Sequence, residues 1–117
     1  MSSDDYQILI PPSFVALFVP PGRIKPTASR QEIAARYGFC EDLAQMLTET
    51  ARTMEFNLGI GEPEVLERCL RGLAGGDAGV NPLEAVWVLR RLAELLEWAD
   101  PGEQPFGFDA RAAMDAA

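Results

Sequence analysis

The sequence predicts an all-α protein: a compact bundle of about four helices with an extended N-terminal arm. Three observations favour this class. Apolar residues recur at helical spacing between residues 29 and 98, helix-start signals precede the periodic stretches, and no stretch of useful length alternates apolar and polar residues. Such agreement between local signals and the wider pattern is typical of a foldable helix bundle. We expect residues 1–100 to form a single helical domain and residues 101–117 a mobile C-terminal tail.

The chain opens on an apolar segment in which two Pro-Pro pairs bracket seven residues, six of them apolar. A Pro pair cannot lie inside a helix, so at most about two turns fit between the pairs, and we expect a short helix over residues 12–19. The segment is too short to span a bilayer, which needs about 20 residues. It must therefore be buried against the protein or a partner. Residues 8–10 are expected to form the arm, and residues 20–26 an extended linker, because a residue before proline avoids the α region.

The next element is the best-defined helix of the chain. Ser29 and Glu32 form a capping box, in which the serine hydroxyl caps a backbone amide and the glutamate reaches back. Apolar or small residues then recur in alternating steps of four and three, as expected for a helix buried in a bundle: Ile33, Tyr37, Cys40, Ala44, Leu47, Ala51, Met54 and Leu58. Gly38 interrupts this pattern at a cost of about 1 kcal/mol relative to alanine. We expect a continuous or kinked helix, with a break into two helices as the alternative.

Two further helices are expected over residues 63–74 and 81–98. The first has one apolar stripe and ends in a glycine-rich turn. The second opens with an Asn-Pro-Leu-Glu start signal and is apolar nearly all round. It is therefore the central helix of the bundle, or it buries a second face in an oligomer. The alanine-rich end of the chain is too short to hold a helix alone, so we expect it to be mobile unless Phe106 and Phe108 dock.

The overall charge limits the partners. The formal net charge of −8 argues against binding to nucleic acid and to an anionic membrane surface. Cys40 and Cys69 each lie in a helical apolar pattern and are expected to be reduced core thiols. The acidic first residues lack the features of a signal peptide. The sequence therefore predicts a cytoplasmic protein.

The chain is poor in the residues that most enzymes use. It contains no histidine, its two cysteines stand apart, and its only lysine is Lys25. The glycine-rich residues 72–77 lack the Gly-Lys-Ser/Thr ending of a phosphate loop. The carboxylates of Glu41 and Asp42 fit solvent-facing helix positions better than a metal site. We therefore expect no enzymatic activity, no cofactor and no metal.

One resemblance adds to this. The run ILIPPSFVALFVPPGR (residues 8–23), followed by CEDLAQML (residues 40–47), resembles a small family of uncharacterised bacterial proteins. Some members carry the label "ATPase with chaperone activity". The resemblance spans about residues 8–98 and implies a chaperone-like interaction role, but no catalytic motif. Because this chain lacks a phosphate loop, we do not expect ATP hydrolysis.

A basic segment lies within this acidic chain. Between positions 23 and 37 the chain has one acidic residue, Glu32, and four basic residues: Arg23, Lys25, Arg30 and Arg36. The favoured interpretation is that the segment complements the acidic helix beside it. The alternative is that it receives an anion or an acidic partner.

The expected function is a non-catalytic protein-interaction module, an adaptor or regulator. The alternative is an anion-binding or small-molecule-binding regulatory protein that uses the basic segment 23–36. The candidate partner-binding residues are Phe14, Leu17, Phe18, Arg23, Lys25, Trp98, Phe106 and Phe108. We expect a homodimer through residues 81–98 or the Pro-bracketed segment. The competing expectation is a monomer in which that segment folds back over the last helix.

Overall fold

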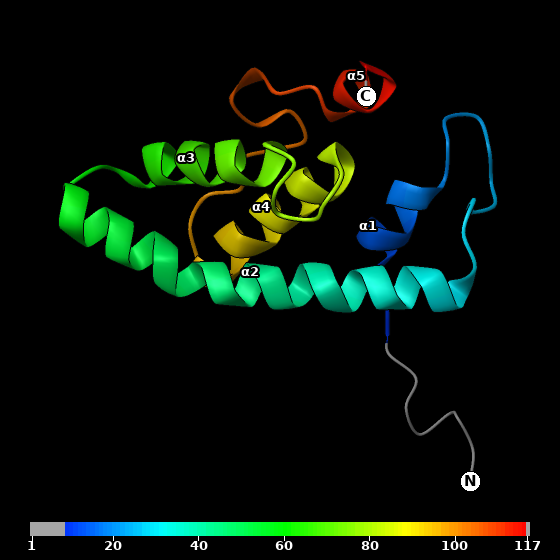
Figure 1. Ribbon diagram of the computed structural model, residues 1–117, viewed down its shortest axis with the longest axis horizontal. Helices are drawn as coiled ribbons and strands as arrows, with labels where there is room; N and C mark the ends of the chain where they lie inside the picture. Colours follow the sequence, from blue (N-terminus) through cyan, green and yellow to red (C-terminus); the bar gives the residue numbers. More distant parts are fainter. Residues whose placement is uncertain (1–8, 117) are drawn as a thin grey trace, which may run out of the picture. The chain divides into compact units, whose positions relative to one another are not determined.

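The computed structural model describes residues 9–116 and is all-α, with no strand among these residues (Figure 1). Its elements are α1 (Pro12–Val15), the 3-10 helix η2 (Ala16–Phe18), α2 (Arg30–Leu58), α3 (Glu62–Ala74), α4 (Pro82–Leu96), the 3-10 helix η3 (Pro105–Gly107) and α5 (Ala110–Ala116). The packing forms two compact units, one ending at Phe39 and one beginning at Cys40, so the boundary falls inside α2. The expected all-α class is confirmed.

The Pro-bracketed segment is helical, as expected, but its second turn is a 3-10 helix. Pro12 opens α1, where its missing N–H has no intrahelical partner to lose. The phenyl ring of Phe14 is fully buried, with its centroid 5.6 Å from that of Phe18 and 5.7 Å from that of Tyr37. These three rings form the aromatic cluster of the first unit. Of the expected arm, residue 8 lies outside the described residues, and residues 9–10 are not helical.

Helix α2 begins at the capping box that the sequence predicts. The Glu32 amide donates to the Ser29 hydroxyl at 3.1 Å, and the Ser29 amide donates to the Glu32 carboxylate at 2.9 Å. These bonds satisfy two backbone donors that the start of a helix leaves unpaired. The helix passes through Gly38 as one element, which confirms the expected continuous or kinked helix over a break into two helices.

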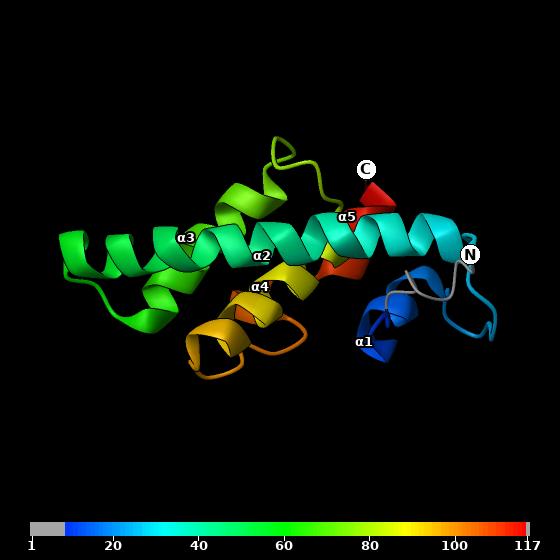
Figure 2. The same ribbon diagram turned by 90° about the horizontal axis from the view of Figure 1, so that it is seen from below.

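Helix α4 is the centre of the second unit. It packs against α3 and α5 (Figures 1 and 2). Its buried residues form one broad face of the helix: Glu84, Ala85, Val86, Val88, Leu89, Leu92, Ala93 and Leu96. Packing against two helices accounts for this face, while the apolar side chains of Leu83, Trp87 and Leu95 stay half-buried. The homodimer inferred partly from that surface stays a prediction.

An ion pair connects α2 with α4 inside this unit. Arg91 donates two hydrogen bonds to the carboxylate of Glu41, at 2.9 and 3.0 Å. The side chains of Arg91 and Glu41 are only 29% and 18% exposed. A two-pronged bond of this kind fixes orientation as well as distance, so it sets how α4 lies on α2.

The two ends of α4 differ in how well the sequence predicts them. At the start, Asn81 and Glu84 form the expected capping box, with bonds of 2.8 and 3.0 Å. At the other end, the helix stops at Leu96, before the expected end near residue 98. Glu97 has a left-handed backbone (φ 62°), and the amide of Trp98 donates to the carbonyl of Ala93 at 2.8 Å. This is the 6→1 bond of a Schellman motif, which is usually built on glycine.

The segment after Pro101, expected to be a mobile tail, contains a 3-10 helix and α5. Pro105 and Ala110 are buried, and α5 packs against α4. The Asp109 carboxylate accepts a hydrogen bond from the Ala112 amide at 3.1 Å and so caps α5. A helix this short is not stable in isolation, so packing against α4 and the Asp109 cap must stabilise it.

Both cysteines are free and buried, as expected of core thiols. Burial raises the pKa of the Cys69 thiol. Across residues 9–116, no helix combines the length and the hydropathy needed to cross a bilayer.

Candidate protein-interaction surface

The residues expected to form an extended linker instead form a closed loop. The backbone amide and the hydroxyl of Thr27 both donate to the carbonyl of Phe18, at 2.8 and 3.1 Å. These two bonds join the end of η2 to the approach to α2. We call residues 19–27 the basic loop. The prediction of an extended linker over residues 20–26 is wrong, because a bond across nine residues outweighs the local preference of residues before proline.

A tight turn stabilises the first half of the basic loop. The amide of Arg23 donates to the carbonyl of Pro20 at 3.0 Å, and Gly22 at the third position has φ +78°. A positive φ at that position is the requirement of a type II turn, and Pro21 occupies the position where proline is favoured. Proline also lowers the entropy of the open chain, so little freedom is left to lose on binding.

The tip of the basic loop presents one apolar side chain between two cations. Ile24 is 93% exposed, and its neighbours Arg23 and Lys25 are also exposed. Within the described part of the chain, neither cation forms an ion pair or a side-chain hydrogen bond. The loop thus exposes an isoleucine and two positive charges on a protein of net charge −8.

The other two residues of the basic segment lie on α2. Arg30 is the first residue of that helix, and the guanidinium of Arg36 lies 4.9 Å from the ring centroid of Phe39, a cation–π distance. The segment 23–36 is therefore divided between a loop and a helix, and Arg36 already has an aromatic partner.

The apolar residues predicted to bind a partner differ in how far they are exposed. Phe14 is fully buried, and Leu17 and Phe18 are half-buried. Phe14 therefore supports the fold of the first unit. Trp98 is half-buried just after α4, where its amide closes the helix.

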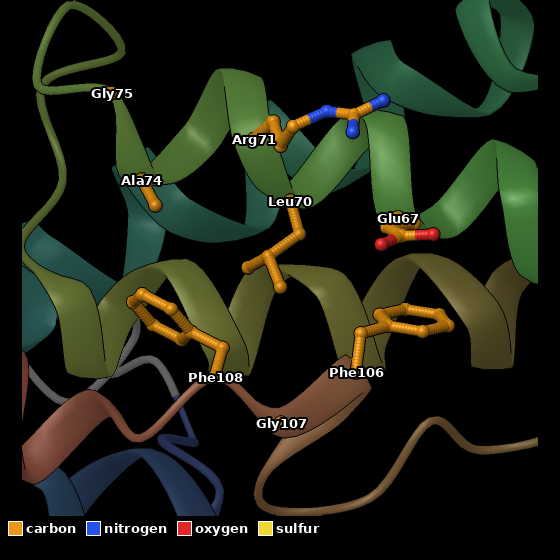
Figure 3. Close-up of a pocket in the computed structure, with 8 residues that line it drawn as sticks. All are labelled: Glu67, Leu70, Arg71, Ala74, Gly75, Phe106, Gly107 and Phe108. Atoms are coloured by element: carbon orange, nitrogen blue, oxygen red, sulfur yellow. The ribbon is translucent and has the colours of Figure 1, made fainter.

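Phe106 and Phe108, in contrast, lie together at an open pocket in the second unit. The pocket has a volume of about 390 Å³ and lies between α3 and the turn that contains η3 (Figure 3). Residues of α3 complete it, among them Glu67, Leu70 and Arg71. The structure thus brings two of the predicted residues into one site and adds three that the sequence analysis missed.

The sequence contained a signal for one missed residue. Ile24 stands alone between two basic residues in a stretch rich in proline and glycine, where no core face is available. Glu67, Leu70 and Arg71 gave no such signal, because their meeting with Phe106 depends on how the C-terminal segment folds back.

The comparisons with known proteins give no match. Neither a family model, nor a curated protein, nor a solved structure matches this chain. The family resemblance noted from the sequence therefore stays a prediction. Among residues 9–116, no three cysteine or carboxylate side chains are grouped so that they could hold a metal ion.

Proposed function

We propose that the protein is a non-catalytic interaction module that docks on an acidic protein partner through its basic loop. The proposal rests on Ile24, which is 93% exposed on a loop closed at its base, between two cations that form no ion pair with any of residues 9–116. A singly exposed isoleucine is ordinary on protein surfaces. The fixed backbone and the flanking charges are what favour docking here.

The chemistry of the loop indicates the partner surface that it fits. Ile24 requires a shallow apolar pocket, and burying such a side chain contributes about 1.5–3 kcal/mol. Arg23 and Lys25 require carboxylates at the rim of that pocket, each pair contributing about 0.2–1 kcal/mol. The charges mainly speed association and select the partner, and the isoleucine slows dissociation. The sum fits a weak and reversible interface.

The test is site-specific crosslinking in cells that express the full chain. A photo-reactive residue such as p-benzoylphenylalanine replaces Ile24 in one variant and Phe56 in the control. Phe56 is 87% exposed, so the two positions are matched in accessibility. We expect a crosslinked protein at position 24 that is absent at position 56, with carboxylates in the crosslinked peptide.

Charge reversal makes the result specific. Arg23→Glu with Lys25→Glu should abolish the crosslink at position 24, and raising the salt concentration should weaken it, since exposed charges are screened beyond about 10 Å at 0.1 M salt. With the purified partner, Ile24→Ala should weaken binding about thirtyfold, the loss of about 2 kcal/mol of apolar burial. Equal crosslinks at both positions, or a crosslink that survives charge reversal, would contradict the proposal. Competition by inorganic phosphate alone would favour the alternative anion-binding function.

A further inference from the structure

The pocket of the second unit has an apolar floor, and its rim carries one acidic and one basic side chain. Leu70 lies between the rings of Phe106 and Phe108, which both point toward α3 (Figure 3). Glu67 and Arg71 stand one helical turn apart on α3 and supply the charged groups. A volume of about 390 Å³ is enough for a small organic ligand.

The backbone is strained at Phe106, one of the residues that line this pocket. Phe106 has φ 55° and ψ 31°, a left-handed conformation that is rare for a bulky residue, and Gly107 follows with φ +79°. The rings of Phe106 and Phe108, two residues apart, lie on the same side of this segment (Figure 3). Asparagine or glycine would adopt this backbone at lower cost. Strained residues of this kind cluster at binding sites, and here the strain holds a ring that is 44% exposed.

The directions of the charged side chains favour a cationic ligand over an anionic one. The carboxylate of Glu67 lies over the ring of Phe106, whereas the guanidinium of Arg71 extends along α3 away from both rings (Figure 3). The two side chains form no ion pair with each other, and within the described residues neither has another partner. Of the two charged groups, the carboxylate is therefore the one directed to the side of the rings (Figure 3).

Three further features also favour a positively charged ligand. Ala74 and Gly75, which line the pocket, mark the C-terminal end of α3, where unpaired carbonyls give a partial negative charge. The faces of phenyl rings attract cations. The net charge of −8 raises the local concentration of cations around the whole molecule.

We propose that this pocket binds a protonated amine on an apolar stem. The ammonium group lies between the carboxylate of Glu67 and the ring of Phe106, and the stem covers Leu70, Ala74 and the ring of Phe108. The site is distinct from the basic loop and does not depend on its function. A free alkylamine and a lysine side chain offer the same chemistry, and the experiment separates these two sources.

The test is an NMR titration of the ¹⁵N-labelled full chain with three probes of equal stem length: hexylamine, hexanol and hexanoate. We expect hexylamine to shift the amides of Leu70, Ala74 and Gly107 with saturation in the millimolar range. Hexanol should bind at least about fivefold more weakly, and hexanoate should not bind. A parallel titration with acetyl-lysine methylamide asks whether a lysine side chain binds as well as the free amine.

Two matched variants on α3 complete the experiment. Both side chains are exposed, so Glu67→Gln and Arg71→Gln should leave the helical spectrum unchanged. Glu67→Gln should weaken amine binding about fivefold, and Arg71→Gln should leave it unchanged or strengthen it. Hexanoate binding that Arg71→Gln abolishes would overturn the proposal, as would the absence of saturable shifts up to about 20 mM amine. Ile24→Ala should leave amine binding unchanged, which keeps this test separate from that of the basic loop.

Discussion

Replacing Glu41 by glutamine tests how the scaffold of the second unit is held together. The Glu41 carboxylate accepts two hydrogen bonds from Arg91, at 2.9 and 3.0 Å, and its side chain is 18% exposed. Arg91 also donates to Glu94 at 2.8 Å, but that carboxylate is 71% exposed. The structure therefore offers a half-buried bond and an exposed bond on one guanidinium.

The expected loss follows from this geometry. Hydrogen bonds to charged groups contribute about 1.5–3 kcal/mol to stability. Glutamine keeps one neutral hydrogen bond to Arg91, and solvent screens part of the charge, so Glu41→Gln should lower the free energy of unfolding by about 1–2 kcal/mol at pH 7. Glu94→Gln, the matched control, should lower it by less than about 0.5 kcal/mol, because exposed pairs contribute little.

The effect of Glu41→Gln should depend on pH in one direction. Hydrogen bonds from Arg91 hold the pKa of the Glu41 carboxyl below its usual value. The unfolded state therefore binds the proton more readily, and the carboxylate contributes stability above the unfolded pKa, near 4.3. That contribution is lost as the pH falls through the lower pKa of the folded state. The difference between the wild type and Glu41→Gln should shrink steadily below about pH 4.

Urea unfolding followed by tryptophan fluorescence is a suitable assay. Trp87 and Trp98 both lie in the second unit, so their emission reports on the unit that contains the ion pair. Unfolding is measured at pH 7 and at about pH 3 for the wild type, Glu41→Gln and Glu94→Gln. Equal losses for the two variants at pH 7, or a loss at Glu41 that is the same at both pH values, would refute the reasoning.

Three further outcomes follow from single positions. Glu97→Gly should raise the free energy of unfolding by about 0.5–1 kcal/mol in the same urea assay, because glycine adopts the left-handed backbone (φ 62°) without a Cβ penalty. Gly22→Ala should speed tryptic cleavage after Arg23, since a side chain at φ +78° strains the turn although no atom lies within 4 Å of its Cβ. The buried thiols Cys40 and Cys69 should react with a thiol reagent only on unfolding; fast reaction of the native protein would contradict their burial.

The helices were predictable because their signals are local. The pairs Ser29–Glu32 and Asn81–Glu84 each lie within one turn, and both form the predicted capping boxes. The end of α4 was not predictable in the same way. Glu97 adopts a backbone that glycine usually provides, so its residue type gives no sign that the helix stops there.

The candidate sites were less predictable because they depend on distant contacts. The bonds from Thr27 to Phe18 that close the basic loop join residues nine positions apart. Phe106 was predicted as a contact residue for its aromatic ring, whereas nothing in the sequence indicated that Glu67 lies at the same pocket. Local patterns predict which helix or loop a residue belongs to, but its tertiary contacts depend on the fold of the whole chain.

We interpret Ile24 and Phe106 as contact residues and not as parts of a core. Each unit has fully buried residues of its own: Phe14 in the first, and Val88, Leu89 and Leu92 of α4 in the second. Both exposed side chains are held by special backbone geometry, a turn closed through Gly22 in one case and a left-handed φ at the residue itself in the other. A chain gains no stability from fixing an apolar group in water, because ordering it costs entropy without removing surface from solvent. Both proposals assign to each group a molecule that covers it, and the neighbouring charges, positive around Ile24 and negative beside Phe106, favour two different molecules.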